Sequence, residues 1–186
     1  MLKGERAILR AIHPEDISRY AEFRNDVELE LLTSPEPPLP RPAEAVRRTV
    51  ELFLAAPGSD VWFGIETQSD FLGHCRLSNV DQFARSCELT IVIGNRDYQG
   101  RGFGSDAVKL LTKYAFRLLN MNRVWLTVAA TNERAIRCFR ACGFVEEGRL
   151  RQHLWRDGGY DDVLQMALLR EDWSAARPPT ADPLAE

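Results

Sequence analysis

Residues 91–105 read Ile-Val-Ile-Gly-Asn-Arg-Asp-Tyr-Gln-Gly-Arg-Gly-Phe-Gly-Ser and join an apolar run to a long helical pattern. Gly100, Gly102 and Gly104 remove side chains from alternate positions, so the backbone N–H groups between them can face one concavity. The helix that begins here adds its first, unpaired amides and the positive end of its dipole. The junction therefore suits a phosphate or a pyrophosphate, and a tight turn that binds nothing is the alternative.

Two common phosphate-binding motifs do not fit this junction. The pattern G-x-x-x-x-G-K-[ST] is absent, because the sequence contains no Gly-Lys-Ser or Gly-Lys-Thr. The dinucleotide pattern G-x-G-x-x-G needs another spacing, since the glycines stand at positions 100, 102 and 104. The loop is therefore a candidate anion site of a different kind.

Regular elements are predicted on both sides of the junction. Before it, the sequence indicates strands at 6–12, 60–67, 71–79 and 86–94, helices from 13 onward and over 43–56, and a stiff proline-rich connector over 35–42. After it, we expect a helix over 104–120, a strand over 124–128, a helix over 132–142 and two strands over 144–155 and 160–169. This order predicts one mixed α/β domain over residues 1–173 and a frayed tail over 174–186.

Composition narrows the class of protein. The chain has 186 residues, 45% of them hydrophobic, and 24 Lys and Arg against 27 Asp and Glu, for a net charge of −3. This charge disfavours bulk capture of nucleic acid or of an anionic membrane. No apolar run approaches the ~20 residues of a membrane span, and the N-terminus lacks the apolar core of a signal peptide. Four cysteines without a C-x-x-C pair then predict a cytoplasmic protein with reduced thiols.

Two motifs carry a resemblance to a known family. Gln99-x-x-Gly102-x-Gly104 and the stretch 132–144, Asn-Glu-Arg-Ala-Ile-Arg-Cys-Phe-Arg-Ala-Cys-Gly-Phe, resemble the hallmarks of the GNAT acetyltransferases. Flanking segments, among them 72–74, 87–94 and 147–151, look like the RimJ/RimL-type branch, and the likeness covers about residues 5–173. It implies an α/β (α+β) GNAT fold, with a mixed, mostly antiparallel twisted sheet of about seven strands and about four helices. Dimers are common among relatives, so a homodimer stays open.

The resemblance implies that the cosubstrate is acetyl-CoA and that no metal is needed. Its pyrophosphate would bind the amides of the glycine loop, and its pantetheine arm would pair like an extra strand with the end of the preceding strand. Asn132 would contact the cosubstrate, with an ordinary helix N-cap as the alternative. The implied cosubstrate-binding residues are Ile91, Val92, Ile93, Gln99, Gly100, Arg101, Gly102, Phe103, Gly104, Ser105, Asn132 and Phe139.

The chemistry implied is direct attack of an amine on the thioester. Glu88, placed like an acid of the family branch, is the candidate general base and would act through a water, with an exposed strand carboxylate as the alternative. Many relatives carry a Tyr beside the sulfur as general acid, but this sequence has Phe139 there. The candidates to replace that hydroxyl are Tyr98, Tyr160, Ser105 and His153, or a water.

The acceptor amine is the least determined part of the prediction. The family places its groove between the first two helices, their loop and the late hairpin, where Glu28, Glu30 and Trp155 are the candidate contacts. Acidic residues there suit a cationic amine or a polyamine, and a protein N-terminus also fits. A CoA-binding sensor that keeps the fold without the activity is the alternative function. Cys138 and Cys142, four residues apart, are interpreted as core cysteines rather than as metal ligands or reactive thiols.

Overall fold

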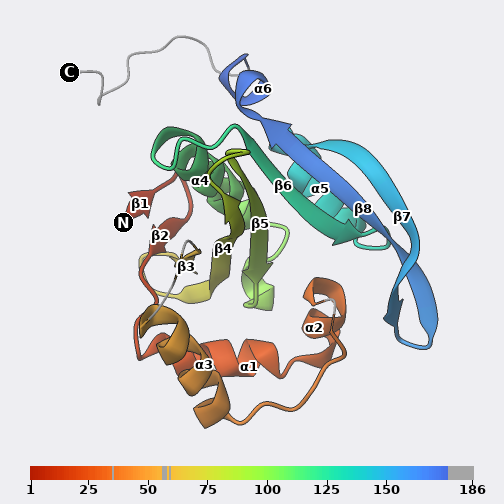
Figure 1. The fold of residues 1–186 in the computed structure, drawn as a ribbon. Helices are drawn as coiled ribbons and strands as arrows, with labels where there is room; N and C mark the ends of the chain where they lie inside the picture. The colour runs from red at the N-terminus through yellow and green to blue at the C-terminus, as the bar shows by residue number, and fades with distance from the viewer. Residues whose placement is uncertain (35, 56–57, 59, 176–186) are drawn as a thin grey trace.

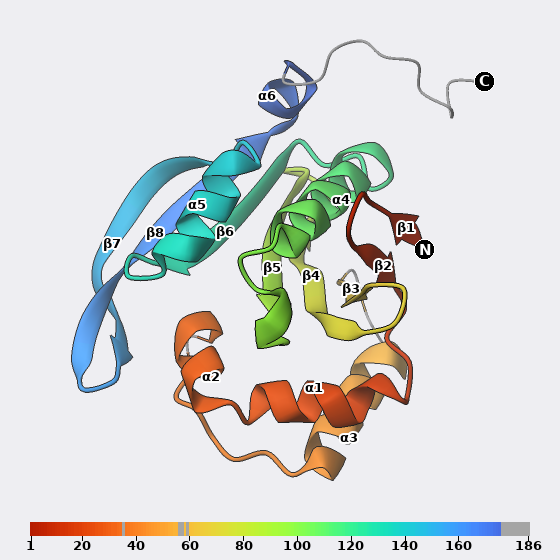
Figure 2. The same ribbon diagram turned by 180° about the vertical axis from the view of Figure 1, so that it is seen from behind.

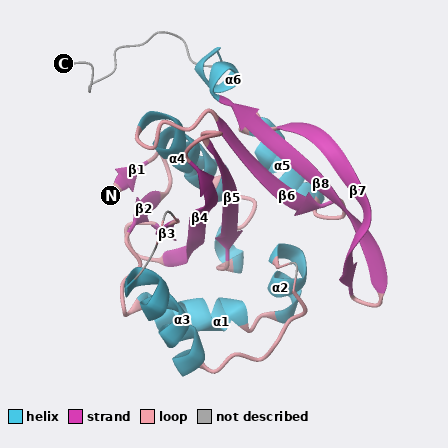
Figure 3. Cartoon of the chain, in the orientation of Figure 1, coloured by secondary structure: helices cyan, strands magenta, loops and turns pink. Residues whose placement is uncertain are grey.

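The computed structural model describes residues 1–34, 36–55, 58 and 60–175. Its strands are β1 (Leu2–Lys3), β2 (Ile8–Arg10), β3 (Val61–Glu66), β4 (Phe71–Asp81), β5 (Ser86–Ile93), β6 (Arg123–Ala129), β7 (Val145–Arg156) and β8 (Gly159–Leu169). Its helices are α1 (Asp16–Arg24), α2 (Val27–Thr33), α3 (Ala43–Ala55), α4 (Phe103–Arg117), α5 (Glu133–Ala141) and α6 (Arg170–Ala175), with a 3-10 turn η1 at Arg96–Tyr98. Figure 3 shows these classes along the chain.

The eight strands form one sheet in the order β1-β2-β3-β4-β5-β6-β8-β7. Every neighbouring pair is antiparallel except β5 and β6, which run parallel (Figure 1). The predicted GNAT fold with a mixed, mostly antiparallel sheet is therefore confirmed. The eighth strand, the two-residue β1, is the one beyond the expected seven.

The parallel contact between β5 and β6 is short. It extends over three pairs, Ser86 with Arg123, Cys87 with Val124 and Glu88 with Trp125. From there β5 continues beside β4 alone, and β6 continues beside β8 as far as Ala129. Figure 1 shows the two strands diverging, so the sheet opens like a V between its two halves. Along the open side of β5, backbone groups after Glu88 face a gap rather than another strand.

A bulge in β4 lies beside the point where the sheet opens. The pairing of β4 with β5 shifts between Ser78 and Asp81, and Asn79 there adopts a left-handed conformation with φ of 50°. Bulges bend a strand and increase its twist. This bulge therefore bends β4 and re-aims the side chain of Asn79 next to Glu88.

Helices pack on both faces of the sheet. Helices α4 and α5 lie together behind the strands in Figure 1 and in front of them in Figure 2. Val108, Leu111 and Phe116 of α4 are fully buried in the main core with β4, β5 and β6. Strand alternation turns the intervening β4 residues to the opposite face. There α1 and α3 form a second cluster around Trp62.

Two element predictions need correction. Helix α2 was not anticipated, because its seven residues fall between the predicted first helix and the proline-rich connector. The expected frayed tail begins too early: Ser174 and Ala175 belong to α6, whose Trp173 packs on Phe116 with ring centroids 5.2 Å apart. Residues 36–42 contain no helix or strand, as the prolines predict. Pro35, the end of the helix predicted over 43–56 at residues 56–57, and the tail over 176–186 lie outside the described residues.

Candidate active site

The glycine loop has the backbone that its sequence predicts. Gly100 and Gly102 adopt φ angles of 72° and 88°, which only glycine takes without strain, and Gly102 is the N-cap of α4. Gly104 has no left-handed φ, and a Cβ added there would lie at ordinary contact distances, 3.7 Å from Ile93 Cγ1 and 4.0 Å from Cys138 Sγ. Gly100 and Gly102 therefore shape the turn, and packing at Gly104 does not require glycine.

The loop presents amides and positive charge together. The first residues of α4, Phe103 to Ser105, carry the amides that have no partner inside a helix. Arg101 is held beside them, because its guanidinium lies 5.6 Å from the centre of the Tyr98 ring and donates to the Asp97 carbonyl at 3.1 Å. Such a helix end stabilises anionic oxygens at little reorganisation cost. The loop fits a pyrophosphate on its geometry.

Two side chains of the loop are engaged inside the protein. Gln99 Nε2 donates to the Ile93 carbonyl at 2.7 Å, and Gln99 Oε1 accepts from Arg134 at 2.8 Å. The hydroxyl of Ser105 lies 3.2 Å from Cys138 Sγ, and the pKa of that thiol lies below its usual range because it hydrogen-bonds Cys142 and Ser105. The predicted contacts of Gln99 and Ser105 with a ligand would therefore be made by their backbone amides. Cys138 and Cys142 lie beside the loop.

A cavity of about 640 Å³ occupies the opening between the two halves of the sheet. Among the predicted site residues it is lined by Glu88, Ile91, Val92, Asn132 and Phe139. Its walls come from both faces of the sheet: α5 lines it on one side, and α1 with β3 and β4 on the other. Ile93 does not line it, and neither do residues 99–105. The opening of the sheet is thus a passage from the α5 side to the α1 side.

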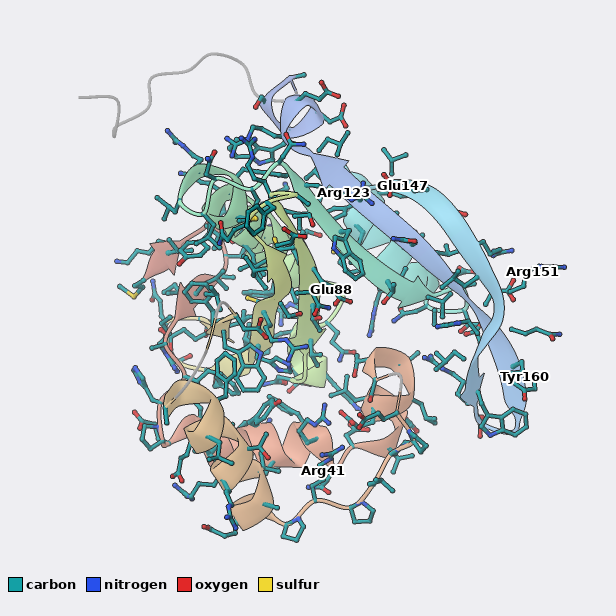
Figure 4. All side chains as sticks on the ribbon, viewed as in Figure 1. Arg41, Glu88, Arg123, Glu147, Arg151 and Tyr160 are labelled. Atoms are coloured by element: carbon teal, nitrogen blue, oxygen red, sulfur yellow. The ribbon has the colours of Figure 1, made fainter. Side chains whose placement is uncertain are left out.

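Glu88 is located where β5 and β6 begin to part, and its side chain lines the cavity. It is half-buried at the last paired position of β5 and β6, and Figure 4 shows its side chain directed from β5 into the opening. The amide of Asn79 donates to Glu88 Oε2 at 2.7 Å, which fixes the carboxylate. One such bond leaves the other oxygen of the carboxylate to accept from a water. The position is suitable for a general base that faces the cavity.

Asn132 and Phe139 line the side of the passage formed by α5. Asn132 is the N-cap of α5, with Oδ1 accepting from the amide of Ala135 at 3.2 Å, while Nδ2 donates to the Leu32 carbonyl at 3.2 Å. The capping interpretation is therefore confirmed, and contact with a cosubstrate stays a prediction. Phe139 is 7% exposed and packs against Phe144. Its ring gives this wall an apolar surface without a hydroxyl.

The four candidates for the general acid have different surroundings. The Tyr98 hydroxyl donates to Asp70 at 2.6 Å, Ser105 is beside Cys138, and Tyr160 is exposed on the β7–β8 hairpin (Figure 4). His153 alone among the four lines the cavity. The general acid therefore stays a prediction, with His153 or a water as the groups nearest to the opening.

The predicted acceptor residues lie away from the large cavity. Glu28 is paired with Arg96 at 2.8 Å. Glu30 is buried, pairs with Arg24 at 3.3 Å, and has its pKa raised because burial disfavours the carboxylate. Trp155 is 57% exposed and packs edge-on against Tyr160 at the end of the hairpin. Glu28 instead borders a second cavity of about 420 Å³, together with Gln99 and Asn132.

The structure adds residues that sequence reasoning did not assign to the site. His74, Arg76, Trp62, Tyr20 and Arg156 all line the large cavity on the side of α1 and the hairpin. His74 is buried, and burial lowers its pKa to about 3, so its imidazole is neutral. A sequence signal existed for two of them: His74 and Arg76 are polar residues at alternate positions between apolar neighbours, a pattern that Ser78 continues. Alternation of this kind marks one face of a strand.

The described residues contain neither a group of metal-ligating side chains nor a helix that could cross a membrane. Within residues 1–34, 36–55, 58 and 60–175, no three His, Cys, Asp or Glu side chains are grouped to hold a metal ion. In the same part of the chain, no helix has both the length and the apolar character that crossing a membrane requires.

The opened sheet and the glycine-led helix define an α/β protein with a cavity where β5 and β6 part, and comparison with known proteins places it in a family. Residues 6–145 match the model of the acetyltransferase (GNAT) domain. The chain belongs to this GNAT acetyltransferase family, as the motifs predicted, and the family uses acetyl-CoA. The RimJ/RimL branch stays a prediction.

Individual relatives agree with this assignment. The chain is 32% identical over 108 residues to a spermidine N(1)-acetyltransferase of Vibrio cholerae, covering 58% of this chain and 62% of that protein. It thus spans less than two thirds of that relative's length. It is 28% identical over 180 residues to the putative ribosomal N-acetyltransferase YdaF of Bacillus subtilis, covering 94% and 97%. A crystal structure of the Vibrio cholerae spermidine N-acetyltransferase with CoA and spermine superposes with a TM-score of 0.83 at 26% identity, covering 91% of this chain and 98% of that one.

Proposed function

We propose that the protein is an acetyl-CoA-dependent N-acetyltransferase that acts on a primary amine. The observation that carries the proposal is the cavity through the opened sheet, with Glu88 at the point where β5 and β6 part. Both faces of the sheet reach this cavity, so two reactants can enter from opposite sides and meet there. The Vibrio cholerae relative named above supports an amine as the acceptor.

The residues present fit acetyl-CoA, which supplies an activated acetyl group as a thioester when bound. The amides at the start of α4 and the guanidinium of Arg101 would hold its pyrophosphate. The unpaired side of β5 at Ile91 and Val92 would accept the pantetheine arm as an added strand. Amides on this side also favour negative charge on the thioester oxygen as the amine attacks. The apolar ring of Phe139 would line the sulfur end.

Glu88 would remove the proton that the attacking amine must lose. A water between the amine and Oε1 would relay the proton to the carboxylate, while Asn79 holds Oε2. The new C–N bond replaces the C–S bond, and the departing thiolate takes a proton from water or from His153. Because Phe139 offers no hydroxyl, protonation of the thiolate relies on these groups.

The acceptor class includes a small-molecule amine, a polyamine or a protein N-terminus. The relatives named for spermidine and for ribosomal acetylation support the second and the third. The alternative function, a CoA-binding sensor, is favoured by one observation: the cavity wall carries Phe139 in place of a proton-donating Tyr. A homodimer and a cytoplasmic location stay predictions.

The test is an acceptor panel with two readouts. Release of the CoA thiol and the mass of the acetylated product are measured with polyamines, monoamines, amino acids and N-terminal peptides. CoA affinity is measured by calorimetry on the same preparation. The proposal expects micromolar CoA binding and turnover on at least one amine. Tight CoA binding with no product from any acceptor would leave the sensor as the function.

A further inference from the structure

The carboxylates in and near the large cavity pair with arginines. Glu36, which lines the cavity, pairs with Arg41 at 3.2 Å, and Glu30, which does not line it, pairs at 3.3 Å with Arg24, which does. The acidic residues that would attract a polyamine are therefore already engaged within the protein. Glu88 is the carboxylate that lines the cavity without an ion pair to any described residue.

Two arginines of the same cavity have the opposite character. No ion pair joins Arg76 or Arg156 to a carboxylate among the described residues. Arg156 Nε and Nη1 are buried without a hydrogen-bond partner, and burial lowers the pKa of this guanidinium against the opposing charge of Asp161. Arg76 lies over the ring of Trp62, with 5.8 Å between its guanidinium carbon and the ring centre. Buried charged donors without acceptors are costly, so the surroundings of Arg156 suit an acceptor-rich group.

Two neutral side chains in the same wall are also without partners. The Nδ1 of His74 and the Nε1 of Trp62 are buried and make no hydrogen bond with the described residues. His74 is fully buried, and its ring meets that of Tyr20 edge-on at 5.0 Å. An indole nitrogen can only donate. The indole nitrogen of Trp62 and the guanidinium of Arg156 are therefore unused donors of residues that line this cavity.

The strand register places Arg76 close to Glu88. Ser78 of β4 lies opposite Glu88, and Arg76 lies opposite Thr90. Arg76 and Glu88 are therefore diagonal neighbours on one face of the sheet, a relationship that puts side-chain roots about 7–8 Å apart. A molecule that meets both groups carries its amine and its anionic group only a few bonds apart.

We propose that the acceptor is a zwitterionic amine, an amino acid or a short peptide with a free carboxylate, whose carboxylate binds Arg76 and Arg156 while its amine lies beside Glu88. This inference rests on the proposed acetyltransferase function and names its substrate class. Arginine forks match a carboxylate with paired hydrogen bonds. A polyamine offers only positive charge, which the two guanidinium groups repel, so the spermidine of the named relative does not fit this end of the cavity.

The test compares acceptors that differ only in the anionic group. Each amino acid is assayed beside its own amide and its decarboxylated amine, with spermidine and spermine as the polyamine arm. We expect at least one amino acid or dipeptide to have a kcat/KM at least tenfold above those of its amide and its decarboxylated amine. We expect the polyamines to be poorer acceptors than that acid. Calorimetric titration of the best acid into the CoA-bound protein supplies a readout that needs no turnover.

Variants assign the selectivity to the two arginines. Arg76→Gln and Arg156→Gln should each reduce the acid-to-amide ratio of kcat/KM toward one, chiefly through a higher KM for the acid. Arg76→Lys should retain part of the ratio. Arg151→Gln is the matched control, because Arg151 is exposed on β7 outside the cavity and points away from it (Figure 4). It should keep the wild-type ratio.

The outcomes separate this inference from the proposed function. Turnover on polyamines that exceeds turnover on every acid, or an acid-to-amide ratio that both arginine variants leave unchanged, overturns the zwitterionic acceptor and leaves the acetyltransferase intact. CoA binding without product from any amine overturns the acetyltransferase. In that case calorimetric binding of an acid that Arg76→Gln weakens still supports the anion subsite, and no such binding overturns it as well.

Discussion

Glu88 of β5 pairs with Trp125 of β6 at the last register where these two parallel strands run side by side. One residue further along, the sheet has already opened, and Glu88 itself lines the cavity at this point. The carboxylate therefore belongs to the rigid, paired part of the sheet and yet faces the opening (Figure 4). Its hydrogen-bond partner Asn79 lies in the bulge of β4. There the backbone has a strained, left-handed φ, and the side-chain amide donates to Glu88. Positions with this combination are common at functional sites.

Glu88→Gln should lower kcat at neutral pH by about 100-fold, in the range that general-base catalysis contributes. The affinity for CoA should stay within about twofold of wild type, because Glu88 lies where β5 and β6 part and not at the glycine loop. The loss should shrink as pH rises toward the pKa of the acceptor amine, since the amine then deprotonates in solution. Steady-state kinetics from pH 6 to pH 10 measure this.

A matched control for that variant is Glu51→Gln, which removes an exposed carboxylate on α3 far from the cavity. It should have wild-type kinetics. Equal activity of Glu88→Gln and wild type at neutral pH would exclude Glu88 as the base.

Gly102→Val should weaken CoA binding at least about 100-fold. The φ of 88° at this position costs an L-residue about 1–2 kcal/mol, and a Cβ would lie 3.3 Å from the side chain of Arg6. The branched side chain would also shield the amides at the start of α4. Calorimetry with CoA measures the loss, with thermal unfolding to show that the variant is folded.

Gly148→Val is the control for the glycine loop. A Cβ added at Gly148 in β7 meets no atom within 4 Å, and valine is favourable in a strand. Unaltered CoA affinity is expected there. Wild-type affinity in a folded Gly102→Val protein would refute the loop as the pyrophosphate site.

Phe139→Tyr should raise kcat by about tenfold, because it places a proton-donating hydroxyl on the cavity wall where many GNAT relatives carry one. CoA affinity should change little, since the ring is retained. Phe83→Tyr adds the same hydroxyl at a fully exposed position and should have no effect. A Phe139→Tyr enzyme no faster than wild type would show that protonation of the thiolate does not limit turnover.

His74 should make the protein less stable in mild acid. Its pKa is about 3 in the folded protein, against an ordinary value of 6.5, because burial disfavours the charged imidazole and Arg24 and Arg76 repel it. The unfolded chain takes up this proton as pH falls below 6.5, and the folded chain does not. Stability is therefore lost between pH 6.5 and pH 3, by about 2 kcal/mol at pH 5.

Urea unfolding of His74→Gln at pH 7 and pH 5 measures this contribution. The variant should lose about 2 kcal/mol less than wild type over that interval. His13→Gln, at a half-exposed position, should follow the wild-type curve. The same loss in His74→Gln and wild type would show that other groups govern the acid sensitivity.

Local patterns were sufficient for most elements and for the backbone of the glycine loop. The left-handed φ of Gly100 and Gly102 and the N-cap at Asn132 depend on residues within a few positions, which a sequence displays directly. Helix α2 escaped prediction because its seven residues, Val-Glu-Leu-Glu-Leu-Leu-Thr, are too few to show a clear period. The same is true of β1, which is a strand only because it pairs with β2.

The charge state of the acceptor side could not be inferred in this way. Glu28 and Glu30 read as free acids in the sequence, but Arg96 pairs with Glu28 across 68 positions, and burial beside Arg24 engages Glu30. The sequence alone places His74 and Arg76 on one face of a strand. Only the tertiary structure shows that this face is directed toward α1 and the cavity.

The sequence by itself determined the family, the order of the main elements and the backbone of the glycine loop, and it supplied Glu88 as the candidate base, because each depends on residues close to one another along the chain. Only the tertiary structure decided that β5 and β6 part after Glu88, and which charges remain unpaired in the opening. The physical reason is that burial and ion pairing depend on distances between segments far apart in sequence, and these distances exist only once the sheet has formed.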